Sequence, residues 1–178
     1  MKLLILFFII LSTSIYAESK IYFGAGYLNV NEKFDDTDAE SSSDAAIFKV
    51  GYGMIEAYAI ELSIYNIKND SNVFSLEDGD KTGADIEIVK AFDTGSFLYP
   101  FFKAGFGAGY MQIDRALEDK LNFGSFNFGV GSFMAVNETF DFELGFRYKS
   151  ISYESVNMVT EEVSHTSSTS SAYFGINA

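Results

Sequence analysis

The sequence contains no cysteine, no tryptophan, one proline and one histidine among its 178 residues. Because cysteine is absent, a disulfide, a thiolate metal site and a cysteine nucleophile are all excluded. Basic residues are scarce as well, since 12 Lys and Arg stand against 25 Asp and Glu and give a formal net charge of −13. Nucleic acid is bound by basic surfaces, so this balance argues against a nucleic-acid partner. The length suits a single domain.

The one long apolar run lies at the N-terminus. Lys2 is followed by the nine-residue run "LLILFFIIL" and then by "STSIYA", which ends at the small residue Ala17. This is the layout of a secretory signal peptide, and the run is too short for a membrane helix, which needs roughly 20 apolar residues. We therefore predict a cleaved signal peptide at 1–17 and an exported domain at 18–178. The alternative is a buried first strand of a cytosolic protein.

Aromatic residues and glycine are abundant, with 19 Phe, 11 Tyr and 15 Gly, and this mix favours strands over helices. In "FDFELGFRYKS" (140–150) apolar residues, mostly aromatic, alternate with residues that are mostly charged. A period of two indicates a strand with two unlike faces. Eight segments alternate in this way, at about 20–30, 45–54, 57–67, 82–92, 97–113, 121–135, 140–153 and 169–178. The predicted fold class is therefore all-β.

The connections between these segments alternate in length. The long ones are 31–44, 68–81, 114–120 and 154–168, and the short ones are 54–56, 93–96 and 136–139. In an up-and-down meander every second connection lies at the same end, so one end has tight turns and the other has long acidic loops. Short periplasmic turns and longer external loops are typical of outer-membrane barrels. The pattern predicts an eight-stranded antiparallel up-and-down transmembrane β-barrel.

The alternation alone does not say which face meets lipid, because a soluble barrel with an apolar interior alternates too. Eleven of the 15 Gly share the polar face. A crowded interior needs small residues, whereas a water-exposed strand site loses roughly 0.5–1 kcal/mol by using Gly. The apolar face also carries tyrosines at two levels, as in the aromatic girdles at membrane interfaces. The predicted girdle comprises Tyr27, Tyr110 and Tyr148 at the loop end and Tyr52 and Tyr58 at the turn end.

The polar face then points into the barrel and carries charges of both signs. These are Lys49, Glu61, Asp85, Glu87, Lys103, Asp141, Glu143, Arg147 and Lys149. We interpret them as a lumenal network of ion pairs, because eight strands leave room for side chains rather than for a water channel. The alternative is a narrow ion path or gate. Lys90 falls on the lipid side of its segment, so either it snorkels to the turn end or a bulge resets the alternation.

Two segments carry a family resemblance. "YPFFKAGFGAGY" (99–110) resembles the aromatic-Pro-aromatic segment with spaced glycines in small outer-membrane β-barrel proteins of the OmpA-like and opacity-protein type. "FNFGVGSFMAVNETFDFELGFRY" (126–148) resembles the hairpin that follows it there. The resemblance implies a monomeric barrel in the outer membrane of a Gram-negative bacterium, inserted by the barrel-assembly machinery and surrounded by lipid and lipopolysaccharide. The chain departs from the family by ending in "YFGINA" instead of an aromatic residue, and no peptidoglycan-binding domain is expected after the barrel.

The predicted loops carry two kinds of residue that are suited to chemistry. Carboxylates cluster at Glu32, Asp35, Asp36, Asp38, Glu40, Asp44, Asp70, Glu77, Asp78 and Asp80. Such groups suit Ca²⁺ or Mg²⁺, but the ligand order of an EF-hand is missing, so we interpret them as solvated loops and predict no metal or cofactor. His165 and Ser167 have the His-x-Ser spacing of lipid A deacylases, another class of eight-stranded barrel. The surrounding motif is absent, and we predict no catalytic residue.

These observations predict a non-enzymatic barrel that displays acidic loops at the cell surface. Its role is structural or interactive, in envelope integrity or in adhesion to an extracellular ligand. A narrow channel and a lipid A-modifying enzyme are the alternatives.

Overall fold

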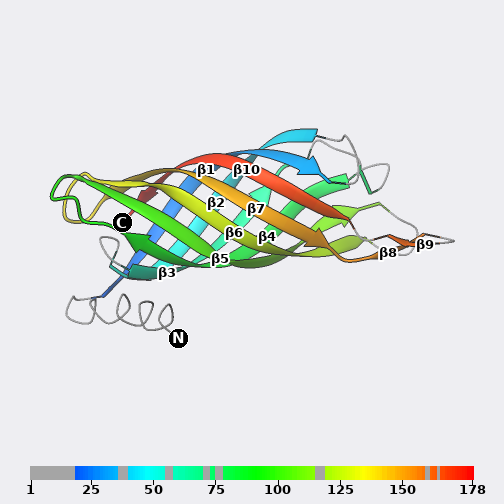
Figure 1. Ribbon diagram of the computed structural model, residues 1–178, viewed down its shortest axis with the longest axis horizontal. Coiled ribbons are helices and arrows are strands. Elements are labelled where there is room, and N and C mark those ends of the chain that lie inside the picture. The colour runs from blue at the N-terminus through cyan, green and yellow to red at the C-terminus, as the bar shows by residue number, and fades with distance from the viewer. Residues whose placement is uncertain are drawn as a thin grey trace, which may run out of the picture.

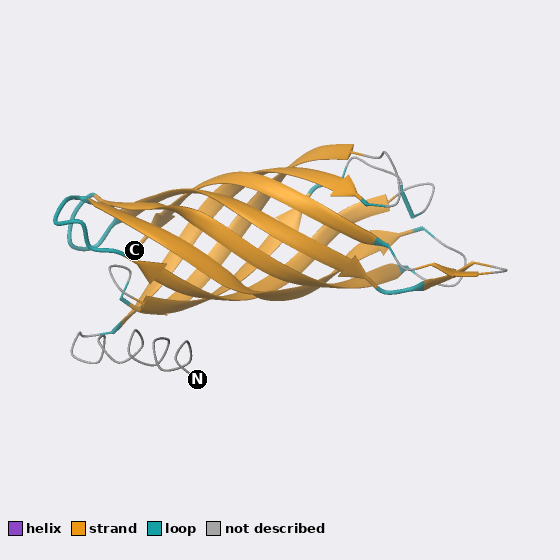
Figure 2. Ribbon diagram, in the orientation of Figure 1, coloured by secondary structure: helices purple, strands orange, loops and turns teal. Residues whose placement is uncertain are grey.

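The computed structural model describes residues 19–35, 40–54, 58–69, 73–74, 78–114, 119–158, 161–163 and 165–178. The predicted signal peptide, 1–17, lies outside these residues and stays a prediction. Within these ranges every regular element is a strand (Figure 2). None of the described residues belongs to a helix long and apolar enough to cross a bilayer.

Eight long strands close into an antiparallel barrel. They are β1 (Lys20–Phe34), β2 (Glu40–Gly53), β3 (Tyr58–Ile67), β4 (Asp78–Ala91), β5 (Leu98–Ile113), β6 (Lys120–Ala135), β7 (Asp141–Tyr153) and β10 (Thr166–Asn177). Each pairs with its neighbour in the chain, and β1 closes the ring against β10 (Figure 1). A separate hairpin, β8 (Val156–Met158) and β9 (Glu161–Val163), extends beyond the barrel at one end. The prediction of an eight-stranded antiparallel meander is confirmed.

The two ends of the barrel differ, as predicted. At the end that holds the C-terminus, the strands are joined by tight turns (Figure 1). In the turn after β4, Asp93 Oδ1 accepts a hydrogen bond of 2.7 Å from the Gly95 amide, and Gly95 has a φ of 68°, which glycine adopts without strain. In the turn after β6, Asn137 Oδ1 accepts from the amides of Thr139 and Phe140. We call this the turn end and the opposite one the loop end.

The strands extend further toward the loop end than the alternation suggested. β1 and β2 reach Phe34 and Glu40, well inside the connection predicted at 31–44. β4 begins at Asp78, and β8, β9 and the start of β10 occupy much of the connection predicted at 154–168. The predicted bounds were wrong because Ser- and Asn-rich stretches carry no apolar alternation on their outer face. Their backbones pair nevertheless, for example Asn31 with Ser42.

The side chains that were predicted to face outward do so in the folded barrel, and those predicted to face inward line its lumen. Outward Phe106 and Phe146 are 67% and 68% exposed, whereas inward Phe133 is fully buried. Lys90 faces outward as well, since the pairing of Tyr58 with Lys90 lies in an unbroken register. Its ammonium lies 3.8 Å from the centroid of the Tyr58 ring at the turn end. This geometry fits the snorkelling alternative and excludes a bulge at that position.

Glycines on the inner face make room for large side chains. A Cβ atom at Gly51 would overlap the ring of Tyr22, and one at Gly83 would overlap the ring of Tyr65. Both tyrosines are buried inside the barrel. The interior is therefore crowded, which is the reason why small residues concentrate on this face.

Candidate functional site

Four charged residues from four strands form a compact cluster in the lumen. The ammonium of Lys103 lies 2.7 Å from Glu143 Oε1 and also contacts Glu61, while Lys49 lies 3.1 Å from Glu61 Oε1 and also contacts Glu143. Each base thus bridges both acids, and the side chains are at most 7% exposed. Two positive and two negative charges cancel, which is what buried ionised groups require.

Polar neighbours complete this central cluster. The Tyr22 hydroxyl donates a hydrogen bond of 2.7 Å to Glu61, and the Asn177 amide donates one of 3.3 Å to Glu143. The first residue comes from β1 and the second from β10, so the cluster links strands on all sides of the lumen. Sequence reasoning placed Lys49, Glu61, Lys103 and Glu143 on the inner face but did not pair them.

A second cluster lies nearer the loop end. Arg147 contacts Asp85 Oδ2 at 3.4 Å and Glu87 Oε2 at 2.5 Å, and Lys149 contacts Asp85 Oδ1 at 3.0 Å. The Lys149 ammonium also lies 3.9 Å from the centroid of the Tyr65 ring, a favourable cation–π position. Eight of the nine predicted charges thus belong to these two clusters. The ninth, Asp141, is half-buried at the turn end of β7.

A third cluster was missed in the sequence. Glu32 forms an ion pair with Lys81 and accepts hydrogen bonds from the hydroxyls of Tyr153 at 2.9 Å and Ser167 at 2.7 Å. All four side chains are buried. Glu32 and Lys81 were assigned to loops, although each has the inward parity of its strand. If the two predicted strands are each extended by two residues toward the loop end, Glu32 and Lys81 fall on the inner face.

Apolar layers close the lumen at both ends, which makes the interior less polar than predicted. Toward the turn end, Tyr22, Val89, Phe101 and Phe133 pack together, with the Phe101 and Phe133 rings 4.4 Å apart between centroids. Toward the loop end lies a cluster of Phe34, Phe74, Met111, Ile113, Leu121, Phe123, Ile151 and Tyr153. The cavity beside Lys103, Glu143 and Tyr173 has a volume of only about 20 Å³, space for about one water molecule.

Phe74, in the connection between β3 and β4, belongs to the apolar cluster at the loop end of the lumen. Its ring lies 4.8 Å from that of Tyr153, and the side chain is 5% exposed. Asp78 Oδ2 holds the segment by accepting hydrogen bonds from the amides of Val73 and Phe74, at 2.6 and 2.8 Å. Phe74 is therefore held in the apolar cluster at the loop end of the lumen.

The predicted girdle tyrosines lie on the outer surface at two levels. Tyr27, Tyr52 and Tyr148 are 52%, 60% and 50% exposed. Tyr58 and Tyr110 are half-buried because Lys90 and Lys120 lie over their rings. Their outward direction is established by the structure, and their role at the membrane interfaces stays a prediction.

The structure places Ser167, of the His165 and Ser167 pair, inside the barrel. Ser167 is 1% exposed, and its hydroxyl donates a hydrogen bond of 2.7 Å to Glu32. A nucleophilic serine must face its substrate, whereas this hydroxyl is enclosed. His165 packs edge-on against Phe74, with ring centroids 5.2 Å apart.

The acidic loop residues fall partly outside the described residues, namely Asp36, Asp38, Asp70 and Glu77. Among the residues that the structure does describe, no group of three or more His, Asp or Glu side chains is placed to hold a metal ion. Asp35 accepts a hydrogen bond of 2.8 Å from Thr166, and Asp44 accepts one from Asn29.

An eight-stranded barrel with an apolar exterior, a charged interior and unequal ends defines a class of outer-membrane protein. A family model described as "Outer membrane protein beta-barrel domain" matches residues 3–175. The chain belongs to this family. No curated protein sequence matches the chain.

Solved structures share the fold at low sequence identity. Neisserial surface protein A has a TM-score of 0.72 and 13% identity, with 91% of this chain and 99% of that one covered. Ail of Yersinia pestis, in complex with the heparin analogue sucrose octasulfate, has a TM-score of 0.57 and 13% identity, covering 91% and 100%. OprG of Pseudomonas aeruginosa has a TM-score of 0.54 and 13% identity, covering 91% and 96%. These likenesses show the fold, and the family places the protein in the Gram-negative outer membrane, in a lipid and lipopolysaccharide environment.

Proposed function

We propose that this protein is a surface-interaction barrel, in which the closed β-barrel is an anchor and the external acidic loops bind a partner. The observation that carries the proposal is the filled lumen. Its charges are paired in three clusters, apolar layers cover both ends, and the cavity at the central cluster has a volume of only about 20 Å³. With an interior of this kind, transport is disfavoured and the loops are the part of the molecule available for binding.

The sign of the loops indicates the chemistry of the partner. The connection between β1 and β2, residues 35–39, contains three Asp and no basic residue, and the whole chain has a net charge of −13. Ail was crystallised with a sulfated heparin analogue, which is an anion. Acidic loops repel such a ligand and attract basic surfaces, so a basic protein surface is the partner that fits this chain. The same membrane anchor would also contribute to envelope integrity. We further infer that the protein is a monomer and that the barrel-assembly machinery inserts it.

The test is attachment of bacteria that express the protein to surfaces coated with poly-L-lysine or with heparin. Wild-type cells are expected to attach to poly-L-lysine more than cells without the protein, and the gain should fall as salt rises. The triple variant Asp35→Asn, Asp36→Asn, Asp38→Asn should lose most of the gain. Asp93→Asn with Glu138→Gln, at the turn end, is the matched control and should keep it. Equal attachment of all strains, or a gain on heparin only, would contradict the proposal.

A further inference from the structure

The β8–β9 hairpin stands beyond the barrel at the loop end (Figure 1). It follows directly on the β7–β10 pair. The Tyr153 amide donates a hydrogen bond of 3.0 Å to the His165 carbonyl, and three residues further along the chain Val156 pairs with Val163. The hairpin forms a two-stranded sheet of its own, whereas the eight long strands form a closed barrel. Among the described strands, only β8 and β9 therefore have an open edge.

The neighbouring strands end before they reach the hairpin. On the β1 side, the Asp35 amide donates a hydrogen bond of 3.1 Å to the Thr166 carbonyl, just beyond the end of β1. On the β6 side, contact is made at the base of the hairpin, where the Asn122 carbonyl accepts a hydrogen bond of 2.9 Å from the Glu154 amide. The outer edges of β8 and β9 thus have no strand partner within the described part of the chain.

A hairpin of this kind is incomplete as a sheet. A two-stranded hairpin is marginally stable in water at best, and the unpaired amides and carbonyls along a strand edge are a template for another strand. Extended peptides are recognised in this way, with main-chain hydrogen bonds giving the affinity. The barrel strands cannot serve, since each is paired on both sides. The hairpin is the place where an extended segment from outside can add to the described part of this fold.

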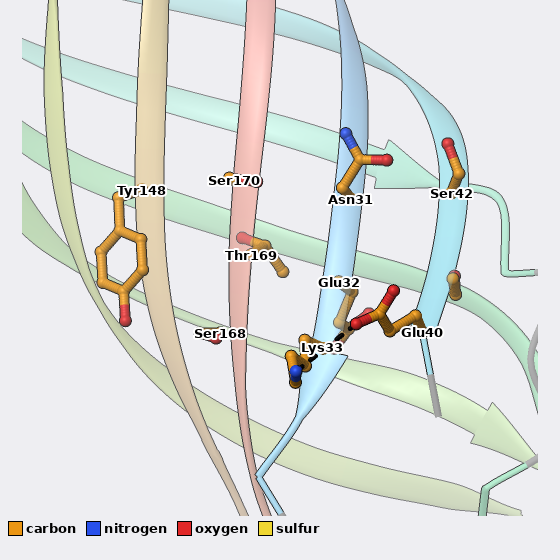
Figure 3. A pocket seen from close by; sticks show the side chains of 10 residues that line it. Asn31, Glu32, Lys33, Glu40, Ser42, Tyr148, Ser168, Thr169 and Ser170 are labelled. Carbon is orange, nitrogen blue, oxygen red and sulfur yellow. Dashed lines mark ion pairs between the residues drawn. The ribbon is translucent and has the colours of Figure 1, made fainter. Parts of the chain in front are cut away.

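Charge distinguishes the two edges of the hairpin. Its segment, 154–165, contains three Glu and no Lys or Arg, and the connection 35–39, which leaves β1 beside the start of β10, contains three Asp and no basic residue. Lys33, the last base on β1, is paired with Glu40 at 3.4 Å (Figure 3). At the foot of the opposite edge, β6 begins with Lys120. The β9 edge, on the β1 side, therefore attracts a basic segment more strongly than the β8 edge does.

We propose that the β9 edge binds an extended, lysine- or arginine-bearing segment of a partner protein, which adds to the hairpin as a third strand. The inference rests on the proposed function, since it says how the basic partner is held. Main-chain hydrogen bonds provide the docking, and the acids on the β1 side select the sign of the incoming side chains. The third strand also completes a sheet that two strands alone hold only weakly.

The test uses two synthetic peptides of the same sequence, in which lysine and threonine alternate. One has an ordinary backbone, and the other is N-methylated along its whole length, which keeps the charge and removes the amide donors. Each is titrated into the folded full-length protein in phosphatidylcholine nanodiscs, and hydrogen exchange of the protein amides is followed. We expect the ordinary peptide to bind about tenfold more tightly than the methylated one and to slow exchange in β9, because only this peptide can form the ladder.

Three variants separate strand addition from charge. Replacement of 156–163 by a glycine–serine linker of equal length should abolish the difference between the two peptides. Glu161→Gln with Glu162→Gln should weaken both peptides equally and keep the difference, because it removes charge and leaves the backbone edge. Asp93→Asn with Glu138→Gln, at the turn end, is the matched control and should change neither affinity. Heat-dependent mobility on SDS gels checks that every variant is folded.

The two peptides also separate this inference from the proposed function. Equal affinities of the wild-type protein for both peptides would overturn the inference and leave the proposed function standing, since acidic loops would then bind basic chains without a third strand. No binding of either peptide would contradict both. Slowed exchange in β8 and not in β9 would overturn the assignment of the partner to the β1 side.

Discussion

At the scale of single residues, the stability of the barrel depends on buried lumenal charges that are all paired. Lys103 is 2% exposed and bridges Glu61 and Glu143, two carboxylates that also share Lys49. Removal of one base leaves two buried acids with a single cation. A buried charge without compensation is among the most costly defects in a protein.

We therefore expect Lys103→Met to lower the free energy of unfolding by about 3–5 kcal/mol, since it breaks a buried ion pair from one side. Urea unfolding in phospholipid vesicles measures the change. Lys90→Met is the matched control. This lysine lies on the outer surface beside Tyr58, so its removal leaves no buried carboxylate unpaired. Losses of equal size in the two variants would show that the central cluster contributes little.

Gly51 provides a second prediction at this scale. Gly51→Ala pushes a methyl group into the ring of Tyr22, which donates to Glu61, and overpacking of this kind costs about 1–3 kcal/mol. Gly124→Ala should be close to neutral, since nothing lies within 4 Å of the added methyl. In the Tyr22→Ala background the cost of Gly51→Ala should largely disappear. A cost that persists there would point to the backbone and not to the ring.

At the scale of elements, the outward face of a strand changes character along its length. On β7 the outward residues run from Phe142 and Leu144 through Phe146 and Tyr148 to Ser150. We interpret the change from aromatic residues to Ser150 as the membrane boundary on this strand. Beyond it, pairing continues without an apolar outer face, because the backbone hydrogen bonds and the inward residues, such as Ile151, still hold the strands together.

This boundary predicts a position-dependent cost on one face of β7. Leu144→Arg, near the middle of the apolar band, should lower the free energy of unfolding in vesicles by about 2–4 kcal/mol, because arginine is poorly tolerated at the bilayer midplane. Ser150→Arg, six residues further along the same face, should cost less than about 1 kcal/mol. If both variants lose the same stability, the apolar band does not end at Tyr148.

At the scale of the whole molecule, closure leaves the eight long strands without an open sheet edge. β1 pairs with β10 over eleven residue pairs, from Gly24 with Asn177 to Phe34 with Ser167. Along these registers each strand is hydrogen-bonded to a neighbour on both sides, as a structure in lipid requires. Closure also brings charges from distant strands face to face, which no single hairpin could do.

Closure predicts heat-dependent mobility in outer membranes solubilised in SDS. The unboiled protein should migrate as a compact species and shift on boiling, because SDS does not open a fully hydrogen-bonded ring until it is heated. Gel migration with and without boiling measures this. Recovery of the protein in the periplasm, with no shift on boiling, would contradict the membrane location.

A filled lumen predicts the absence of a steady pore. Purified folded protein in a planar bilayer should show little or no steady conductance, since eight strands leave no open channel and apolar layers cover both ends. Single-channel recording is the measurement, with a large-barrel porin as the positive reference. Large and stable steps from the wild-type protein would contradict the anchor role proposed above.

The sequence by itself determined the strand number, the direction of each face and the inequality of the two ends. An alternation with a period of two assigns every residue to one face, so residues such as Glu143 and Phe146 could be placed without a structure. It also indicated the crowded interior, through the eleven glycines that share the polar face.

Only the tertiary structure decided which inward residues meet and where the strands end. Glu32 joins Lys81, Tyr153 and Ser167 because β1, β4, β7 and β10 come together around the loop end of the lumen. Glu32 is 49 to 135 positions away from these three partners in the chain, and their meeting follows from strand tilt, stagger and closure. Local pattern sets the face of a residue, whereas the geometry of the closed barrel sets its partners.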